Sequence, residues 1–218
     1  MVVIIVFPCP KGMTGGNSVH QEQVVWYIDN FTTIGGNTIT VLGEPRVVAP
    51  SGESFIEFDG IDDGIQVDNH PLEGAGEFTI EIIFRPDTGG LAEQRFLHLQ
   101  ESDSENRLLI ETRLTDNNEW YLDTYIRSDD TSQTLIDSSH LHPVGEWFAA
   151  ALVFDGTEMR HYVNGILELS AEIAHFSPPH AGKTSIGVRM NKVCWFKGAV
   201  KRVRFTRRAL APAELLVL

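Results

Sequence analysis

Hydrophobic and polar positions between residues 94 and 127 alternate in three short runs separated by two polar clusters. Side chains on a β-strand point alternately to two faces, so each run is predicted to be a strand with one apolar face. The opposite faces carry Arg, His, Tyr and carboxylates, where an ordinary solvated face carries Lys, Glu, Thr and Ser. The polar faces hold His98 and Gln100 in the first run, Arg107, Glu111 and Arg113 in the second, and Tyr121, Asp123, Tyr125 and Arg127 in the third.

Similar alternation along the rest of the chain predicts an all-β protein. Strands are expected at residues 24–30, 38–43, 54–59, 65–67, 77–85, 147–154, 160–163, 184–190 and 193–205. Asn164-Gly165 is the strongest hairpin signal, and only residues 212–218 look helical, with proline in the first turn. Many short strands separated by turn signals indicate a two-sheet antiparallel β-sandwich, or jelly roll, with a short C-terminal helix.

Length and charge narrow the classes of partner. The 218 residues suit one domain, predicted over residues 21–218, after an N-terminal arm or signal remnant at residues 1–20. The net charge of −13 argues against nucleic acid, which is bound largely by Lys and Arg. The apolar run at residues 2–7 is too short to span a bilayer and fits either a first strand or the remnant of an export signal.

The two cysteines leave a further choice open. Cys9 and Cys194 either form a bridge, if the terminal strands pair, or remain two unrelated thiols. No Cys or His cluster has the spacing of a zinc site.

Four stretches together resemble the laminin-G-like, concanavalin A-like lectin and glucanase jelly rolls. They are FIEFDGIDDGIQV (55–67), EFTIEIIFRPD (77–87), EWFAAALVFDGTEMRHYVNG (146–165) and WFKGAVKRVRFTRRALAPAEL (195–215). The resemblance covers about residues 50–216 and implies the sandwich fold, with one curved sheet whose outer face forms a groove. Its members include carbohydrate lectins, calcium-dependent adhesion modules, glycoside hydrolases and polysaccharide lyases, so it specifies the fold more closely than the function.

The unusual polar face is therefore predicted to form a ligand groove. Arginine and lysine would hold uronate carboxylates or sulfates, and aromatic rings would stack on sugar faces. The alternative is that Glu111–Arg113 and Asp123–Arg189 are ion pairs that stabilise the sheet. The predicted ligand-binding residues are Gln100, Arg107, Arg113, Asp123, Arg189, Asn191, Trp195 and Lys197.

Whether chemistry takes place in this groove stays open. The candidate catalytic residues are His98, Tyr121, Tyr125, Glu81 and Glu111. A retaining glycosidase needs two carboxyls about 5 Å apart, but the E-x-D-x-x-E strand of the related glucanases is absent from the sequence. A polysaccharide lyase needs a group that neutralises the uronate and a Tyr or His that transfers the proton. The segments HLQ (98–100), IETR (110–113) and WFKG (195–198) are only partly similar to the motifs of jelly-roll alginate lyases.

Calcium is a further expectation. Asp59, Asp62 and Asp63 cluster in a glycine-rich turn and Asp155 lies in a hairpin turn, and calcium prefers oxygen ligands of this kind. The simpler explanation is that Asp-Gly pairs build turns. The sequence thus predicts an exported protein, extracellular or periplasmic, that binds a polysaccharide; a carbohydrate-active enzyme and a calcium-dependent adhesion module are the alternatives.

Overall fold

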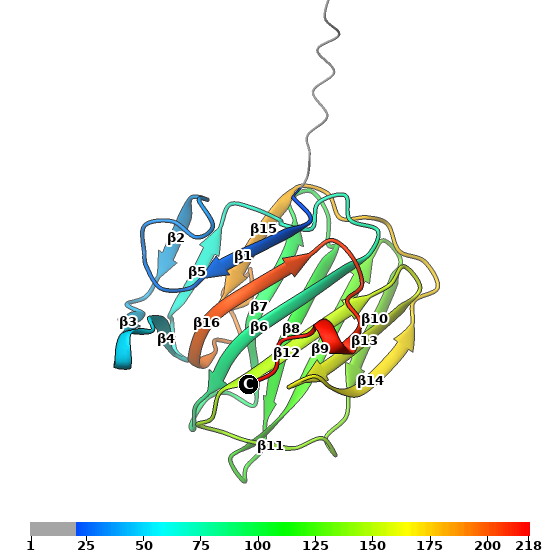
Figure 1. The fold of residues 1–218 in the computed structure, drawn as a ribbon. Coiled ribbons are helices and arrows are strands. Elements are labelled where there is room, and N and C mark those ends of the chain that lie inside the picture. The colour runs from blue at the N-terminus through cyan, green and yellow to red at the C-terminus, as the bar shows by residue number, and fades with distance from the viewer. Residues whose placement is uncertain (1–20) are drawn as a thin grey trace, which may run out of the picture.

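Two antiparallel sheets pack face to face in the computed structural model, which describes residues 21–218 (Figure 1). The expectations for residues 1–20, including an arm, a signal remnant and the partner cysteine Cys9, lie outside the described residues. Within the described range, no helix is long and apolar enough to cross a membrane. The predicted all-β sandwich is confirmed.

The sheet nearer the viewer in Figure 1 is here called the front sheet. Its strands in spatial order are β14 (Ile166–Glu172), β13 (Glu158–Val163), β12 (Phe148–Phe154), β6 (Phe78–Pro86), β16 (Lys197–Thr206), β4 (Phe55–Asp59) and β3 (Arg46–Val48), and β1 (Gln23–Tyr27) also pairs with β16. Asn164 and Gly165 form the tight β13–β14 turn, both with positive φ (48° and 77°), as the sequence predicts.

The other sheet, here called the back sheet, contains the three alternating runs of residues 94–127 as neighbours. Its strands in spatial order are β10 (Thr131–Ile136), β9 (Glu119–Ser128), β8 (Arg107–Leu114), β7 (Glu93–Glu101), β15 (Gly182–Ile186), β5 (Gly64–Val67) and β2 (Ile39–Leu42), and β11 (His142–Pro143) also pairs with β9. Because β7, β8 and β9 are consecutive in the chain and in the sheet, their polar faces form one continuous surface.

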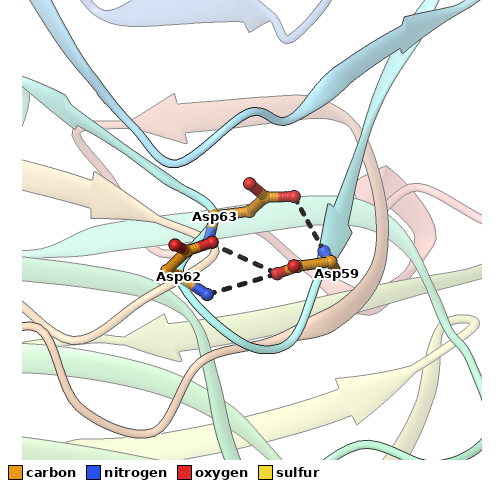
Figure 2. Close-up of side chains that lie close together, drawn as sticks. All are labelled: Asp59, Asp62 and Asp63. Atoms are coloured by element: carbon orange, nitrogen blue, oxygen red, sulfur yellow. Dashed lines mark hydrogen bonds between the residues drawn. The ribbon is translucent and has the colours of Figure 1, made fainter.

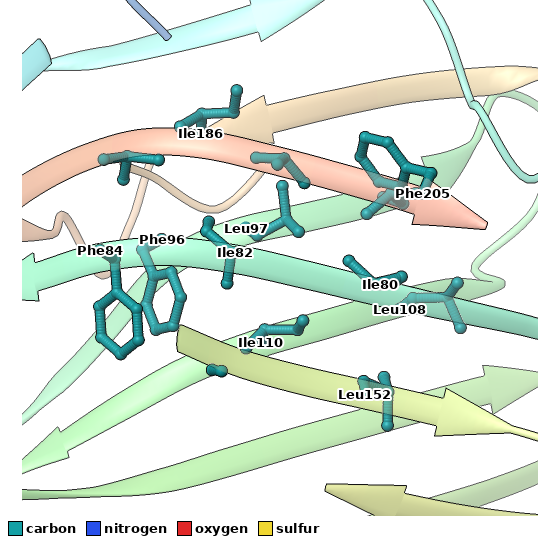
Figure 3. Close-up of a cluster of buried hydrophobic side chains, with 14 of the residues drawn as sticks. Ile80, Ile82, Phe84, Phe96, Leu97, Leu108, Ile110, Leu152, Ile186 and Phe205 are labelled. Carbon is teal, nitrogen blue, oxygen red and sulfur yellow. The ribbon is translucent and has the colours of Figure 1, made fainter. Parts of the chain in front are cut away.

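The core lies between the apolar faces of the two sheets (Figure 3). Phe84 of β6 stacks on Phe96 of β7 with the ring centroids 4.2 Å apart, which joins the sheets near their middle. Leu97, Leu108 and Ile110 point into this core. Burial of these faces leaves the opposite face of β7–β9 to the polar side chains.

Two expectations about the C-terminal part need correction. The predicted helix begins at Pro212 but is only one 3₁₀ turn, η2 (Pro212–Glu214); a second such turn, η1, is at Pro50–Gly52. The basic run at residues 201–208 is typical of a charged strand that protects a sheet edge. Most of it instead belongs to β16, an inner strand with β6 on one side and β1 and β4 on the other, because the neighbours of a strand depend on distant segments.

Candidate functional site

A cavity of about 240 Å³ lies on the outer face of the back sheet, and we call it the back-sheet cavity. It collects six of the predicted groove residues from β8, β9 and the loop after β15. The predicted residues that line it are Arg107, Glu111, Arg113, Asp123, Tyr125 and Arg189; Arg95, Leu109 and Thr134 complete the lining. Their roles in binding or catalysis stay predictions.

Strand register explains why these side chains meet. Glu111 of β8 lies directly opposite Asp123 of β9, and directly opposed residues on one face have closely spaced side chains. Leu109 is opposite Tyr125 in the same strand pair. The alternation of the sequence was enough to place these residues on one face, and the antiparallel pairing aligns them.

The carboxylates at one end of the cavity are held by arginines. Arg113 donates to Oδ2 of Asp123 at 2.8 Å through Nε and contacts it at 2.6 Å through Nη2. Arg95 Nε lies 3.0 Å from Oε2 of Glu111, but the N–H is not aligned for a hydrogen bond. Glu93 bridges both arginines. The ion pairs expected from the sequence, Glu111–Arg113 and Asp123–Arg189, are thus replaced by different pairings.

Arg95 is the charged residue of the cavity lining that the alternation misses. The pairing of β7 with β8 shifts between Arg95 and Leu97, so Phe96 is an extra residue in the ladder. Such a β-bulge changes which face the preceding residues occupy, and it points Arg95 to Glu111 while Phe96 enters the core. Two adjacent apolar residues, Phe96 and Leu97, interrupt the alternation and are the signal that could have located the bulge.

Burial raises the pKa of the carboxyls in this network. Glu111 is 2% exposed, and burial followed by the negative charge of Asp123 raises its pKa to about 7. Burial also raises the pKa of Asp123, against the opposing effect of Arg113. Glu111 therefore changes its charge near neutral pH.

The opposite end of the cavity is cationic and aromatic. The Arg107 guanidinium lies over the Tyr125 ring, 5.2 Å from its centroid. Among residues 21–218 its one acidic contact is with the exposed Glu105. Since Arg95 and Arg113 hold the carboxylates of the cavity, Arg189 has no acidic partner in the part of the chain that the structure describes. These groups remain available to an anionic ligand.

His98 lies on the same face of β7 but is 1% exposed. The Met190 N–H donates to its Nδ1 at 2.9 Å, which leaves the ring hydrogen on Nε2. Burial, with the charges of Arg189, Arg107 and Arg95, lowers the pKa of His98 to about 3. A neutral imidazole of such low pKa is a poor general base near neutral pH. The hydrogen bond from Met190 indicates instead that His98 holds the loop that carries Arg189.

Four other predicted residues do not line the cavity. Gln100 is half-buried and donates to the Ser104 carbonyl at 3.5 Å. Tyr121 is opposite Arg113 and half-buried. Asn191 is exposed on the loop after β15, and the Trp195 ring lies near Gly64 of β5.

The groove positions predicted for Glu81 and Lys197 were wrong. Glu81 lies on the outer face of the front sheet, where it is 1% exposed, pairs with Arg204 and accepts the Leu216 N–H at 2.7 Å. The C-terminal segment covers this face. Lys197 begins β16 opposite Asp59 in the front sheet. Alternation assigns a residue to a face of its own strand but does not reveal which sheet that strand joins.

The three aspartates of the predicted calcium site gather as expected, with carboxylate oxygens within 4.8 Å of one another (Figure 2). Asp63 accepts the N–H groups of Glu44 and Asp59 at 2.7 and 3.0 Å, and Asp59 accepts the N–H of Ile61 at 2.8 Å. These bonds build the turn. The exposed carboxylate of Asp62 accepts no hydrogen bond from the described residues, and the oxygen donors suit calcium.

Asp155 does not belong to that cluster. It sits after Phe154, which pairs with Phe78 at the start of β6, whereas Asp59 lies near the end of β6. Its carboxylate accepts the Thr157 and Glu158 N–H groups and pairs with Arg160. Asp155 therefore stabilises the β12–β13 hairpin.

A larger cavity, about 860 Å³, lies among the β5–β6, β7–β8, β9–β10 and β14–β15 loops and is lined by several acidic residues. Its carboxylates tie these loops together: Glu101 accepts the His180 N–H at 2.8 Å and Asp129 accepts the Ser177 hydroxyl at 2.5 Å. Because Glu101 and Asp129 are engaged in this way, size alone does not make it the better site.

Known proteins share this architecture. Domain 4 of AbnA, an extracellular arabinanase from Geobacillus stearothermophilus solved with arabinotriose, aligns at a TM-score of 0.66 and 16% identity over 88% of this chain and 96% of that domain. The receptor-binding domain of botulinum neurotoxin C/D mosaic serotype aligns at 0.66 and 11% identity, over 88% of this chain and 49% of that domain. The binding domain of Paraclostridial Mosquitocidal Protein 1 gives 0.65 and 15%, over 88% and 50%.

The chain thus spans about half the length of the two toxin domains, and at these identities the likeness shows the fold alone. No curated protein sequence matches the chain. The family model for the concanavalin A-like lectin/glucanases superfamily, Laminin_G_3, matches residues 59–216. With most of the chain matched and the two-sheet sandwich described above, this protein belongs to the concanavalin A-like lectin/glucanases superfamily.

Proposed function

We propose that this protein binds an acidic polysaccharide in the back-sheet cavity. The observation that carries the proposal is the presence of Arg107 and Arg189 at one end of the cavity, free of buried carboxylate partners, in a chain of net charge −13. Arginine recognises carboxylates and sulfates through a planar fork of N–H donors. The carbohydrate ligands of related folds, such as arabinotriose with the arabinanase domain, support a sugar as the class of ligand.

Within the proposed complex, the two ends of the cavity act differently. Arg107 and Arg189 bind the acid group of a sugar unit, and the Tyr125 ring, already in contact with Arg107, offers an apolar edge to the sugar. Glu111 and Asp123 face the hydroxyl groups. A polysaccharide of this kind is met outside the cell, in keeping with the predicted extracellular or periplasmic location.

Calcium at Asp59, Asp62 and Asp63 is a separate part of the proposal. These carboxylates would provide oxygen ligands and the ion would fix the β4–β5 turn. Because Asp59 is paired in the front sheet, such an ion would act on stability and not on the cavity.

Affinity electrophoresis tests the proposed function. Alginate, polygalacturonate and chondroitin sulfate represent acidic ligands, and arabinan and mannan represent neutral ones. We expect at least one acidic gel to retard the wild type, with the retardation lost in Arg189→Ala. Arg46→Ala removes an exposed arginine from the front sheet and serves as the matched control. Retardation by neutral gels only, or retardation unchanged in Arg189→Ala, would contradict the proposal.

The same polymers distinguish a binding protein from a lyase. A lyase produces an unsaturated sugar that absorbs at about 235 nm, because β-elimination leaves a conjugated double bond. A binding protein leaves the absorbance constant. We expect constant absorbance, because His98, one of the candidate proton-transfer residues, is buried and of low basicity.

A further inference from the structure

The network at the acidic end of the back-sheet cavity, buried except for the partly exposed Glu93 and Arg113, has an unequal number of charges. Glu93, Glu111 and Asp123 share two arginines, Arg95 and Arg113. Three carboxylates therefore face two guanidinium groups. A surplus negative charge in a buried site is unfavourable unless it is neutralised, so this network has a place for one proton.

Hydrogen bonding indicates where that proton resides. Oε2 of Glu111 and Oδ1 of Asp123 are buried and have no hydrogen-bond partner among the described residues. Asp123 still receives two contacts from Arg113 on its other oxygen. Glu111 is the less well compensated of the two, and its pKa, raised to about 7, agrees with this assignment.

The charged and titratable groups around Glu111 come from every neighbouring element. Glu93 and Arg95 face it from β7, Arg113 lies on its own strand β8 and Asp123 lies on β9. From the loop after β15, Arg189 lines the same cavity and the Cys194 sulfur lies 3.7 Å from Glu93. Burial raises the pKa of that thiol, which keeps it neutral.

An acidic ligand would add negative charge to this cavity. Arg107 and Arg189 line the same 240 Å³ space as Glu111 and Asp123. A nearby like charge favours the neutral form of a carboxyl. Binding of the anion and protonation of the carboxyl pair must then favour each other, because linkage between two binding events is reciprocal.

We propose that the Glu111–Asp123 pair takes up one proton as an acidic sugar binds, and that the protonated Glu111 carboxyl donates a hydrogen bond to the ligand. The inference rests on the proposed function and adds a specificity-determining residue to it. The proton comes from solvent, and no bond other than the O–H bond of the carboxyl forms. A protonated carboxyl is the one form of Glu111 that can donate a hydrogen bond, here to a hydroxyl oxygen of the sugar.

Calorimetry at several pH values tests the inference, with oligogalacturonate and oligoalginate as the probes. We expect the wild-type Kd to increase up to about tenfold per pH unit above pH 7, the limit for one linked proton. Titrations in buffers of different ionisation enthalpy should show proton uptake near pH 7. Glu111→Gln, which is always neutral, should bind with a Kd independent of pH and without proton uptake. Asp116→Asn, an exposed acid in the β8–β9 turn, is the matched control and should keep the wild-type pH dependence.

Two further measurements keep the test decisive. Carboxyl ¹³C NMR of the ligand-free protein should show one group that titrates near pH 7 and is missing in Glu111→Gln. If that variant does not fold, Asp123→Asn takes its place in the test, because it removes the negative charge to which Glu111 is coupled. Binding that is equal at pH 6 and pH 8, without proton uptake, overturns the inference and leaves the proposed function standing. Absence of binding at every pH overturns the proposed function, and the NMR titration still decides whether Glu111 carries the proton.

Discussion

The guanidinium group of Arg107 lies 5.2 Å above the ring centroid of Tyr125, across strands β8 and β9. A cation positioned over an aromatic face is attracted by the ring's quadrupole. The contact therefore fixes the arginine at the cationic end of the back-sheet cavity before any ligand arrives, and it makes the pair a natural anchor for an acidic sugar.

Substitutions in this pair should separate charge from ring. Arg107→Ala is expected to weaken binding of oligogalacturonate or oligoalginate roughly 10- to 100-fold, the loss of a hydrogen bond to a charged group. Tyr125→Phe keeps the ring beneath the arginine and should change the affinity by less than about threefold. Isothermal titration calorimetry measures both. A larger loss of affinity in Tyr125→Phe than in Arg107→Ala would show that the phenol hydroxyl, and not the arginine, dominates recognition.

Glu81 should behave as a structural residue. Glu81→Gln leaves the largely buried Arg204 without its charged partner, so the free energy of unfolding is expected to fall by about 2–3 kcal/mol. Ligand affinity should be unchanged, because Glu81 lies in the other sheet. Urea denaturation and calorimetry give the two values. Glu53→Gln removes the partner of Lys201 in an exposed pair and should leave the unfolding midpoint in place. A loss of binding without a loss of stability would return Glu81 to the site.

Three buried histidines predict sensitivity to acid. Burial lowers the pKa of His70 to about 4, and that of His98 and of His161 to about 3. Below pH 6.5 the three histidine rings bind protons in the unfolded chain but stay neutral in the folded protein. The stability present above pH 6.5 is therefore lost as the pH falls. The slope near pH 5 should reach about 4 kcal/mol per pH unit, less about 1 kcal/mol per pH unit from the opposite effect of Glu111.

Urea unfolding curves between pH 4.5 and 7 measure this slope. Between pH 5 and 7, imidazole NMR signals of these three histidines should show little protonation in the folded protein. A flat stability profile, or a folded-state titration of these rings near pH 6.5, would contradict the burial of neutral imidazole.

Calcium addition should act on the β4–β5 turn alone. We expect millimolar calcium to raise the Tm by a few degrees, because a ligand that binds only the folded state stabilises it by mass action. The effect should disappear in Asp62→Asn, whose carboxylate is not used by the turn, and persist in Asp155→Asn, at the far end of β6. Differential scanning calorimetry with and without EGTA measures it. Equal Tm values in both solutions would show that the aspartates serve the turn only.

The sequence by itself determined the strand content, the N-G hairpin and the common face of Glu111, Asp123 and Tyr125. These features depend on short-range order: side chains alternate along a strand wherever it is placed, and a two-residue turn selects its own residues. The similarity of residues 50–216 to the concanavalin A-like jelly rolls identified the fold for the same reason, because its motifs are strands and turns.

Only the tertiary structure decided which strands are neighbours and where their order breaks. The bulge at Phe96 points Arg95 to Glu111, and the loop after β15 places Arg189 in the cavity lining. Glu81 and Lys197 belong to the front sheet and therefore lie outside the cavity. Each of these depends on pairing between segments far apart in the chain, which period-two alternation does not encode. The faces were thus fixed by local geometry, and the cavity arose from the non-local packing of two sheets.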